Sequence, residues 1–147
     1  MKFVVYSRST MQNANPSTQP WGVISVCENG DFPEIHTNDQ MVGRLNLQFH
    51  DVDFFARGER EDERTLFSID MANEVLDFFF AGADKGMTVL YVHCLMGQCR
   101  SAAIAAALAK ITTGDDMLYF SRSGPYRPNM RVYRTIIEQA HQRKLIG

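Results

Sequence analysis

The sequence lacks the features that mark membrane proteins, disulfide-rich domains and nucleic-acid binders. No apolar run approaches the roughly eighteen residues needed to cross a membrane, and the apolar run at residues 3–5 is too short for a signal peptide. The formal net charge is only −2, so there is no overall attraction to nucleic acid or anionic lipid. The three cysteines show no disulfide pattern, which favours a reducing compartment. We therefore expect a cytoplasmic protein with no membrane or nucleic-acid partner.

Internal repeats, low-complexity tracts and metal-ligand patterns are also missing. The four histidines lack the spacing of metal ligands, so we expect no metal and no cofactor; they are His36, His50, His93 and His141. The chain has 147 residues, of which 45% are hydrophobic and 22% charged. This size and composition predict a single domain, residues 1–147, with one substantial core. The oligomeric state is left open.

The apolar patterns predict strands that alternate with helices. Expected strands are residues 3–6, 22–27, 44–49 and 88–92, and residues 9–20 are a short helix or a loop. Expected helices are residues 65–85, 101–111, 115–120 and a last one capped by Asn129, with Val132, Ile136, Ile137 and Ala140 facing inward. This alternation indicates an α/β fold with a mainly parallel sheet flanked by helices.

The most informative segment is His93-Cys94-Leu95-Met96-Gly97-Gln98-Cys99-Arg100-Ser101, between an apolar strand and an alanine-rich helix. We call residues 94–100 the cysteine loop. A strand–loop–helix unit directs backbone N–H groups and the positive end of a helix dipole at one point. An anion bound there would also meet the forked guanidinium of Arg100. The same field would stabilise the Cys94 thiolate, which is the reactive form of cysteine.

These residues resemble the signature loop of the cysteine-based protein tyrosine phosphatases, and of their compact dual-specificity branch in particular. Residues 45–51 resemble the segment that leads to that family's acid loop, and Arg127-Pro128-Asn129 fits the start of its last helix. The resemblance implies a three-layer α/β/α sandwich. It also implies hydrolysis of a phosphorylated protein or a small phosphomonoester through a cysteinyl-phosphate intermediate.

Each loop residue then has an expected role. Cys94 is the nucleophile, and the loop amides hold the phosphate together with Arg100; the loop residues are Leu95, Met96, Gly97, Gln98, Cys99 and Arg100. Gly97 suits a backbone that bends closely around a ligand. Ser101 can hydrogen-bond the Cys94 sulfur when it leaves the intermediate. The resemblance implies that His93 orders the loop through hydrogen bonds to backbone.

The proton donor is less sharply defined, because residues 50–63 contain six carboxylates. We expect Asp51, which directly follows the predicted strand, as the family arrangement implies. Asp53 is the nearest alternative, and Asp62 has a family-like spacing to Cys94 but lies in a charge run. Glu59, Glu61 and Glu63 complete the set.

Three further questions stay open from sequence. Cys99 either packs beneath the loop or captures an oxidised Cys94 as a disulfide. The basic stretch of Arg122, Arg127, Arg131 and Arg134 is either a solvated face or a border of the pocket. A rhodanese-like sulfurtransferase and a phosphate-binding pseudophosphatase are the alternatives to a phosphatase.

Overall fold

The computed structural model describes residues 1–53 and 65–146. Its elements in chain order are β1 (Lys2–Ser7), α1 (Arg8–Asn13), β2 (Trp21–Cys27), β3 (Met41–Gln48), α2 (Ile69–Asp84), β4 (Val89–Cys94), α3 (Arg100–Thr113), α4 (Met117–Phe120) and α5 (Met130–Gln142). In this part of the chain, no helix is long and apolar enough to span a bilayer.

The four strands form one parallel sheet in the order β1-β4-β2-β3. Ser7 is paired with Cys94, and Ser25 with His93, so the carboxyl ends of neighbouring strands meet at one edge. The predicted parallel α/β fold is therefore confirmed. In sheets of this kind ligands bind beyond the carboxyl ends of the strands, which is where β4 delivers the cysteine loop.

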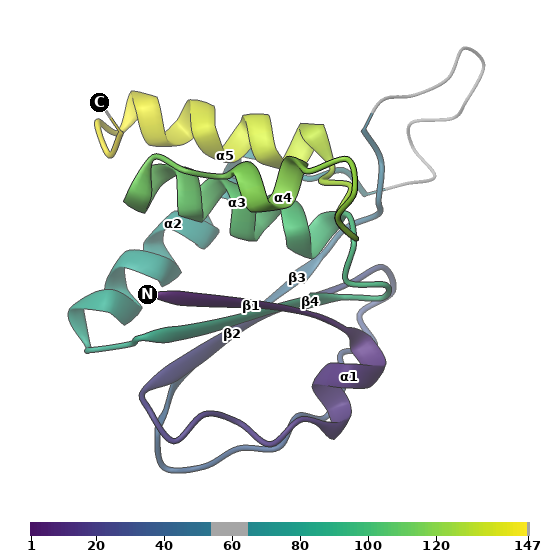
Figure 1. Ribbon diagram of the computed structural model, residues 1–147, viewed down its shortest axis with the longest axis vertical. Helices are drawn as coiled ribbons and strands as arrows, with labels where there is room; N and C mark the ends of the chain where they lie inside the picture. The colour runs from purple at the N-terminus through teal and green to yellow at the C-terminus, as the bar shows by residue number, and fades with distance from the viewer. Residues whose placement is uncertain (54–64, 147) are drawn as a thin grey trace.

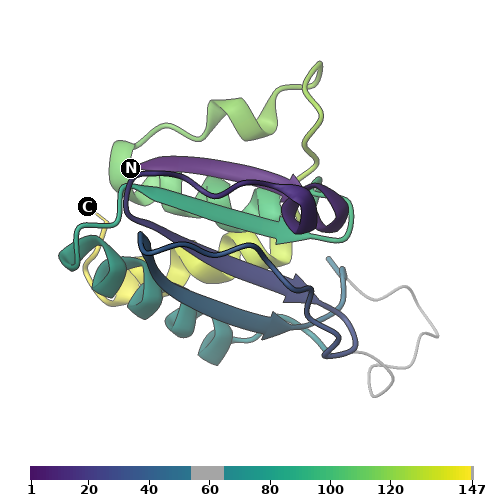
Figure 2. The ribbon, with the colours of Figure 1, turned by 90° about the horizontal axis from the view of Figure 1, so that it is seen from below.

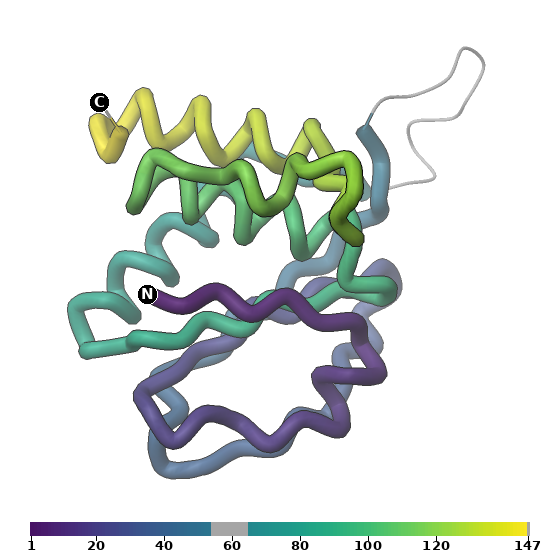
Figure 3. The backbone as a smooth tube through the Cα atoms, in the orientation of Figure 1, coloured from purple at the N-terminus to yellow at the C-terminus, as the bar shows by residue number. Residues whose placement is uncertain are grey.

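The two faces of the sheet are covered unequally. Helices α2, α3, α4 and α5 lie on one side, and α1 with two long connections lies on the other (Figures 1 and 3). Alternate residues of β4 serve the two faces: Leu90, Val92 and Cys94 belong to the main core, while Val89 and Tyr91 join a smaller cluster with Trp21. The layers of the predicted sandwich are present, and the second helical layer is one short helix.

Helix α3 is buried along most of its length. Every residue from Arg100 to Ala109 is less than 9% exposed, and six of these ten are alanine. The helix lies between the sheet and α5 (Figure 1). Small side chains let it approach the sheet closely, so the first turn of α3 is held rigidly behind the cysteine loop.

Local capping signals set the ends of two helices. The predicted helix at 65–85 begins only at Ile69, because the Ser68 hydroxyl accepts the N–H of Met71 at 3.2 Å. Asn129 caps α5 as predicted, accepting the N–H of Val132 at 3.1 Å. Val132, Ile136 and Ala140 are fully buried, and Ile137 is partly buried. Strand β3 starts at Met41, three residues earlier than the alternating pattern indicated.

Candidate active site

The cysteine loop turns sharply between β4 and α3. Gly97 has φ of 70°, a conformation that side chains disfavour. A Cβ at this position would lie 2.6 Å from the backbone nitrogen of Ser7, at the end of β1. Glycine is thus required twice, for the turn and for the close approach of the loop to β1.

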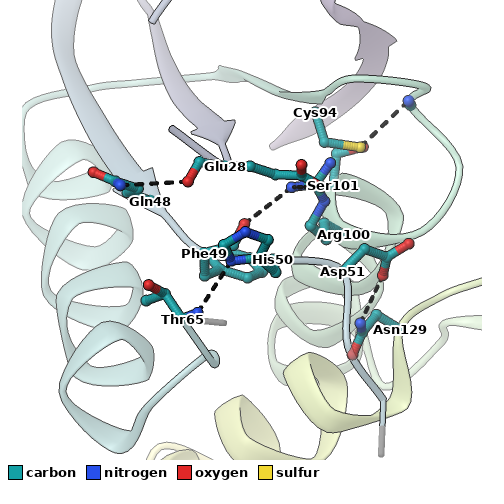
Figure 4. A network of polar contacts seen from close by, with 11 residues as sticks. Glu28, Gln48, Phe49, His50, Asp51, Thr65, Cys94, Arg100, Ser101 and Asn129 are labelled. Carbon is teal, nitrogen blue, oxygen red and sulfur yellow. Dashed lines mark hydrogen bonds and ion pairs between the residues drawn. The ribbon is translucent and has the colours of Figure 1, made fainter. Parts of the chain in front are cut away.

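The Cys94 thiol is buried and receives hydrogen bonds on two sides. Its Sγ lies 3.1 Å from the Ser101 Oγ and 3.3 Å from the Gly97 nitrogen (Figure 4). Burial by itself raises the pKa of Cys94, but bonds from Ser101 and Gly97 and the charge of Arg100 outweigh it. The net effect is a lowered pKa, which favours the nucleophilic thiolate.

Backbone donors and Arg100 surround the space in front of this sulfur. Within the described residues, no hydrogen bond uses the N–H groups of Leu95, Met96 or Gln98. Arg100 is 4% exposed, and its Nη1 donates to the Phe49 carbonyl at 3.0 Å. The loop is therefore arranged to receive an anion, with one fixed positive charge.

Two neighbouring segments hold the loop from outside, through three backbone hydrogen bonds. The Arg8 N–H donates to the Leu95 carbonyl at 3.2 Å. From the other side, the N–H groups of Arg127 and Asn129 donate to Gln98 and Cys99 at 2.8 and 3.0 Å. These bonds occupy outward-facing carbonyls of the loop, which keeps its shape fixed before any ligand binds.

The two candidate acids nearest the predicted strand have different partners. Asp51 Oδ1 accepts the side-chain N–H of Asn129 at 2.7 Å, which places its carboxylate near the cysteine loop (Figure 4). Asp53 Oδ1 instead accepts the N–H groups of Met130 and Arg131 at 2.5 and 3.2 Å. Asp53 thus serves the N-terminus of α5, whereas Asp51 lies beside the cysteine loop. Glu59, Glu61, Asp62 and Glu63 lie outside the described residues.

The His93 ring contacts a side chain of the neighbouring strand β2. Its Nε2 lies 2.5 Å from the hydroxyl of Ser25, and its Nδ1 has no partner among the described residues. Ser25 on β2 is thus the side-chain partner of the ring, because successive residues of a strand face opposite sides and Cys94 takes the loop side. The loop-ordering role expected of His93 stays a prediction. Burial, with the nearby charge of Arg44, lowers the pKa of His93 to about 4, so the ring is neutral at pH 7.

Cys99 is a poor thiolate. Burial and the neighbouring Asp51 carboxylate raise the pKa of Cys99 to about 11. The side chain is half-buried and ends the loop just before α3. This environment favours the packing interpretation over a reactive thiol.

Two of the four arginines of the basic stretch use their side chains within the fold. The Arg127 guanidinium donates to the carbonyls of Gly124, Tyr126 and Arg122 at 2.8, 2.6 and 3.0 Å. Arg131 Nε donates to the Phe67 carbonyl at 3.3 Å. Arg127 thus holds the segment beside the cysteine loop, and Arg131 joins α5 to the segment before α2.

Sequence reasoning missed two residues that contact the expected machinery. Glu28 Oε1 lies 3.5 Å from Arg100 Nη1, at a pocket of about 260 Å³ that Arg100 and Leu95 also line. Asn129 holds Asp51, besides capping α5. Glu28 could have been found from its position directly after a buried strand. In residues 1–53 and 65–146, no group of three metal-ligating side chains comes together.

Comparison with known proteins gives matches by structure only. No family model matches the sequence, and neither does any curated protein. The human tyrosine phosphatase-like serine/threonine/tyrosine-interacting protein has 18% identity and a TM-score of 0.65, over 97% of this chain and 93% of that one. PTPMT1 in complex with PI(5)P has 14% identity and a TM-score of 0.61, over 96% and 91%. Human DUSP28 has 17% identity and a TM-score of 0.57, over 97% and 94%.

These likenesses cover nearly the whole of each chain at low identity. They show that this chain has the fold of the dual-specificity-like, cysteine-based tyrosine phosphatases. The fold resemblance drawn from residues 93–101 is thus confirmed.

Proposed function

We propose that this protein hydrolyses phosphate monoesters through a cysteinyl-phosphate intermediate, as a protein tyrosine or dual-specificity phosphatase. The observation that carries this proposal is the Cys94 sulfur, which accepts the N–H of Gly97 and is hydrogen-bonded to the Ser101 hydroxyl. Around it, the N–H groups of Leu95, Met96 and Gln98 have no partner among the described residues. Such a loop can bind three phosphate oxygens while a thiolate faces the phosphorus. The whole-chain likeness to phosphatases supports the same reaction class.

In the first step the Cys94 thiolate attacks phosphorus, and the bond from phosphorus to the ester oxygen breaks. Asp51 donates a proton to that oxygen, so an alcohol or phenol leaves. The loop amides and Arg100 stabilise charge on the oxygens of the transferring phosphoryl group. A phosphocysteine and an ionised Asp51 remain.

In the second step water attacks phosphorus and the sulfur–phosphorus bond breaks. The Asp51 carboxylate takes a proton from the water, and inorganic phosphate forms. The hydroxyl of Ser101, 3.1 Å from the sulfur, stabilises the departing thiolate. Both groups return to their starting states.

The loop composition favours a phosphorylated protein over a polyphosphoinositide. Leu95, Met96 and Gln98 carry no charge, and the side chains of Leu95 and Met96 are 57% and 65% exposed. A multiply charged lipid head group calls for cations beside the phosphate site. The structure of PTPMT1 was solved in complex with PI(5)P. Phosphoinositides are therefore the compounds whose turnover should be compared with that of phosphopeptides.

The proposal is tested by turnover of p-nitrophenyl phosphate and of phosphotyrosine and phosphothreonine peptides, with and without EDTA. We expect metal-independent release of phosphate. The Cys94→Ser variant should lose turnover and still bind vanadate or tungstate. The Arg100→Lys variant should lose more than about tenfold in kcat/KM, because an ammonium cannot make the forked contact.

Other results would replace the proposal. Phosphate binding by the wild type without turnover would make the protein a pseudophosphatase. Transfer of sulfur from thiosulfate to cyanide, with no phosphate release, would make it a sulfurtransferase. Loss of activity with EDTA, restored by a divalent cation, would contradict the cysteine mechanism.

A further inference from the structure

Strand β1 is one of the two edge strands of the sheet. On its outer side, the backbone groups of its central residues form no hydrogen bond with any described residue. Its only strand partner among the described residues is β4. An edge strand presents unused N–H and C=O groups that can pair with another chain. The sequence of β1, KFVVYS, contains no proline, and Lys2 is its single charged residue, so it carries little that would prevent pairing.

The register identifies the outward groups. The Lys2 N–H donates to the Thr88 carbonyl at 2.8 Å, and Lys2 is paired with Val89. Because bonding alternates along a parallel strand, Lys2, Val4 and Tyr6 direct their backbone groups at β4. The backbone groups of Phe3 and Val5 point outward, and no described residue bonds to them.

A hollow runs along this strand. It has a volume of about 530 Å³ and is lined by residues 2–6 of β1, by Val89 and Tyr91 of β4, by Ser17 and Thr18, and by Tyr126. Much of its lining is polar, with hydroxyl groups from Ser17, Thr18, Tyr6 and Tyr126. Water can thus reach the side of β1 that borders this hollow.

The occupant must be a single extended strand. Helix α4 and the segment after it lie outside β1 on the helical side of the sheet (Figures 1 and 2). A second copy that paired through its own β1 would bring its own α4 into the same space. A peptide without a helical layer avoids this clash.

The edge leads to the cysteine loop. Ser7, the last residue of β1, is paired with Cys94, and Gly97 rests on the backbone of Tyr6 and Ser7. A strand paired with Phe3 and Val5 therefore ends beside the mouth of the loop. A phosphorylated residue at that end of the strand is directed toward Cys94.

We propose that β1 binds an extended segment of the phosphoprotein substrate by strand addition, next to the phosphorylated residue. This inference rests on the proposed phosphatase function. Binding uses the backbone groups of Phe3 and Val5, so it favours unfolded or loop segments and tolerates many sequences. It also distinguishes a polypeptide substrate from a small phosphomonoester, which cannot use this edge.

The first test leaves the protein unchanged. Phosphotyrosine peptides are prepared with one N-methyl group at each position in turn on either side of the phosphorylated residue. On one side, methylation should lower kcat/KM about fivefold to tenfold at alternate positions only, since one donor in two faces β1. Equal effects at all positions, or none, would overturn the proposal.

The second test changes the edge. Val5→Pro removes the outward N–H, and Val5→Thr is the matched control that keeps it. We expect Val5→Pro to lower kcat/KM several-fold for long phosphopeptides and to leave turnover of p-nitrophenyl phosphate unchanged. Equal peptide turnover by both variants would overturn strand addition. Absence of p-nitrophenyl phosphate turnover in the wild type would instead refute the phosphatase function. If the Val5→Pro variant does not fold, the N-methylated peptides still test strand addition on the unchanged protein.

Discussion

The carboxylate of Glu28 lies 3.5 Å from the guanidinium of Arg100. Glu28 follows the end of β2, the strand beside β4, while Arg100 opens α3 behind the cysteine loop. With the Phe49 carbonyl at 3.0 Å, Glu28 fixes the orientation of the arginine. The guanidinium is thus set in place before an anion arrives, which lowers the cost of organising the site.

Replacing Glu28 with Gln should therefore weaken catalysis while leaving the fold intact. We expect kcat/KM for p-nitrophenyl phosphate to fall by about tenfold, which corresponds to roughly 1.4 kcal/mol. Asp31→Asn is the matched control, because Asp31 pairs with Arg8 at 3.6 Å, in the same pocket. Vanadate affinity and circular dichroism complete the measurement. Equal kinetics for the two variants would refute a positioning role for Glu28.

Ser101→Ala should raise the pKa of Cys94, because it removes a hydrogen bond that favours the thiolate. The rate of alkylation by iodoacetamide should then rise at higher pH than in the wild type. Ser25→Ala is the control, since its hydroxyl faces His93 on the other side of the sheet. An unshifted profile for Ser101→Ala would show that Gly97 and Arg100 suffice.

Asp51→Asn should slow substrates with poor leaving groups most. We expect a loss of about a hundredfold in kcat with a phosphotyrosine peptide and a much smaller loss with p-nitrophenyl phosphate. The basic limb of the pH profile should flatten as well. Asp53→Asn should instead lower stability by about 1 kcal/mol, through the start of α5, without leaving-group dependence. The reverse pattern would assign the acid to Asp53.

His93 should make the protein less stable in acid. Its pKa falls from 6.5 in the unfolded chain to about 4 in the fold, so the unfolded state binds the proton first. Stability is complete above pH 6.5 and is lost as the pH falls toward 4. At pH 5 the loss is about 2 kcal/mol relative to pH 7. In urea unfolding, the His93→Gln variant should lose this pH dependence of the free energy of unfolding. The His141→Gln variant, which changes an exposed histidine, should retain it.

Peroxide should oxidise Cys94 without linking it to Cys99. With its pKa raised to about 11, the Cys99 thiol is almost entirely protonated at pH 7 and attacks a sulfenic acid slowly. Mass spectrometry should find sulfenic or sulfinic acid on Cys94. The Cys99→Ser variant should inactivate at the same rate and give the same products. A Cys94–Cys99 disulfide would reverse this interpretation.

Local patterns in the sequence were enough for much of the architecture. The hydrophobic periods located the strands and helices, and Asn129 and Ser68 act over only a few residues. The turn at Gly97 likewise follows from its immediate neighbours. Such features depend on short stretches of chain, where residue type and spacing determine the backbone.

Contacts that depend on strand order could not be predicted in the same way. Glu28 meets Arg100 because β2 lies beside β4, and no spacing in the sequence encodes that neighbour. The ring of His93 contacts Ser25 because β2, which carries Ser25, pairs with β4. The choice between Asp51 and Asp53 required α5, whose N-terminus engages Asp53.

The dense packing of α3 also bears on how this protein can change over time. Six of the ten residues from Arg100 to Ala109 are alanines in closed surroundings, so a larger side chain there costs about 1–3 kcal/mol or more. A typical domain has only about 5–15 kcal/mol to lose. Most substitutions in α3 should therefore destabilise the fold. Changes in substrate specificity should instead come from substitutions in the segments around the cysteine loop. Saturation mutagenesis should find α3 the least tolerant helix and residues 121–123 among the most permissive.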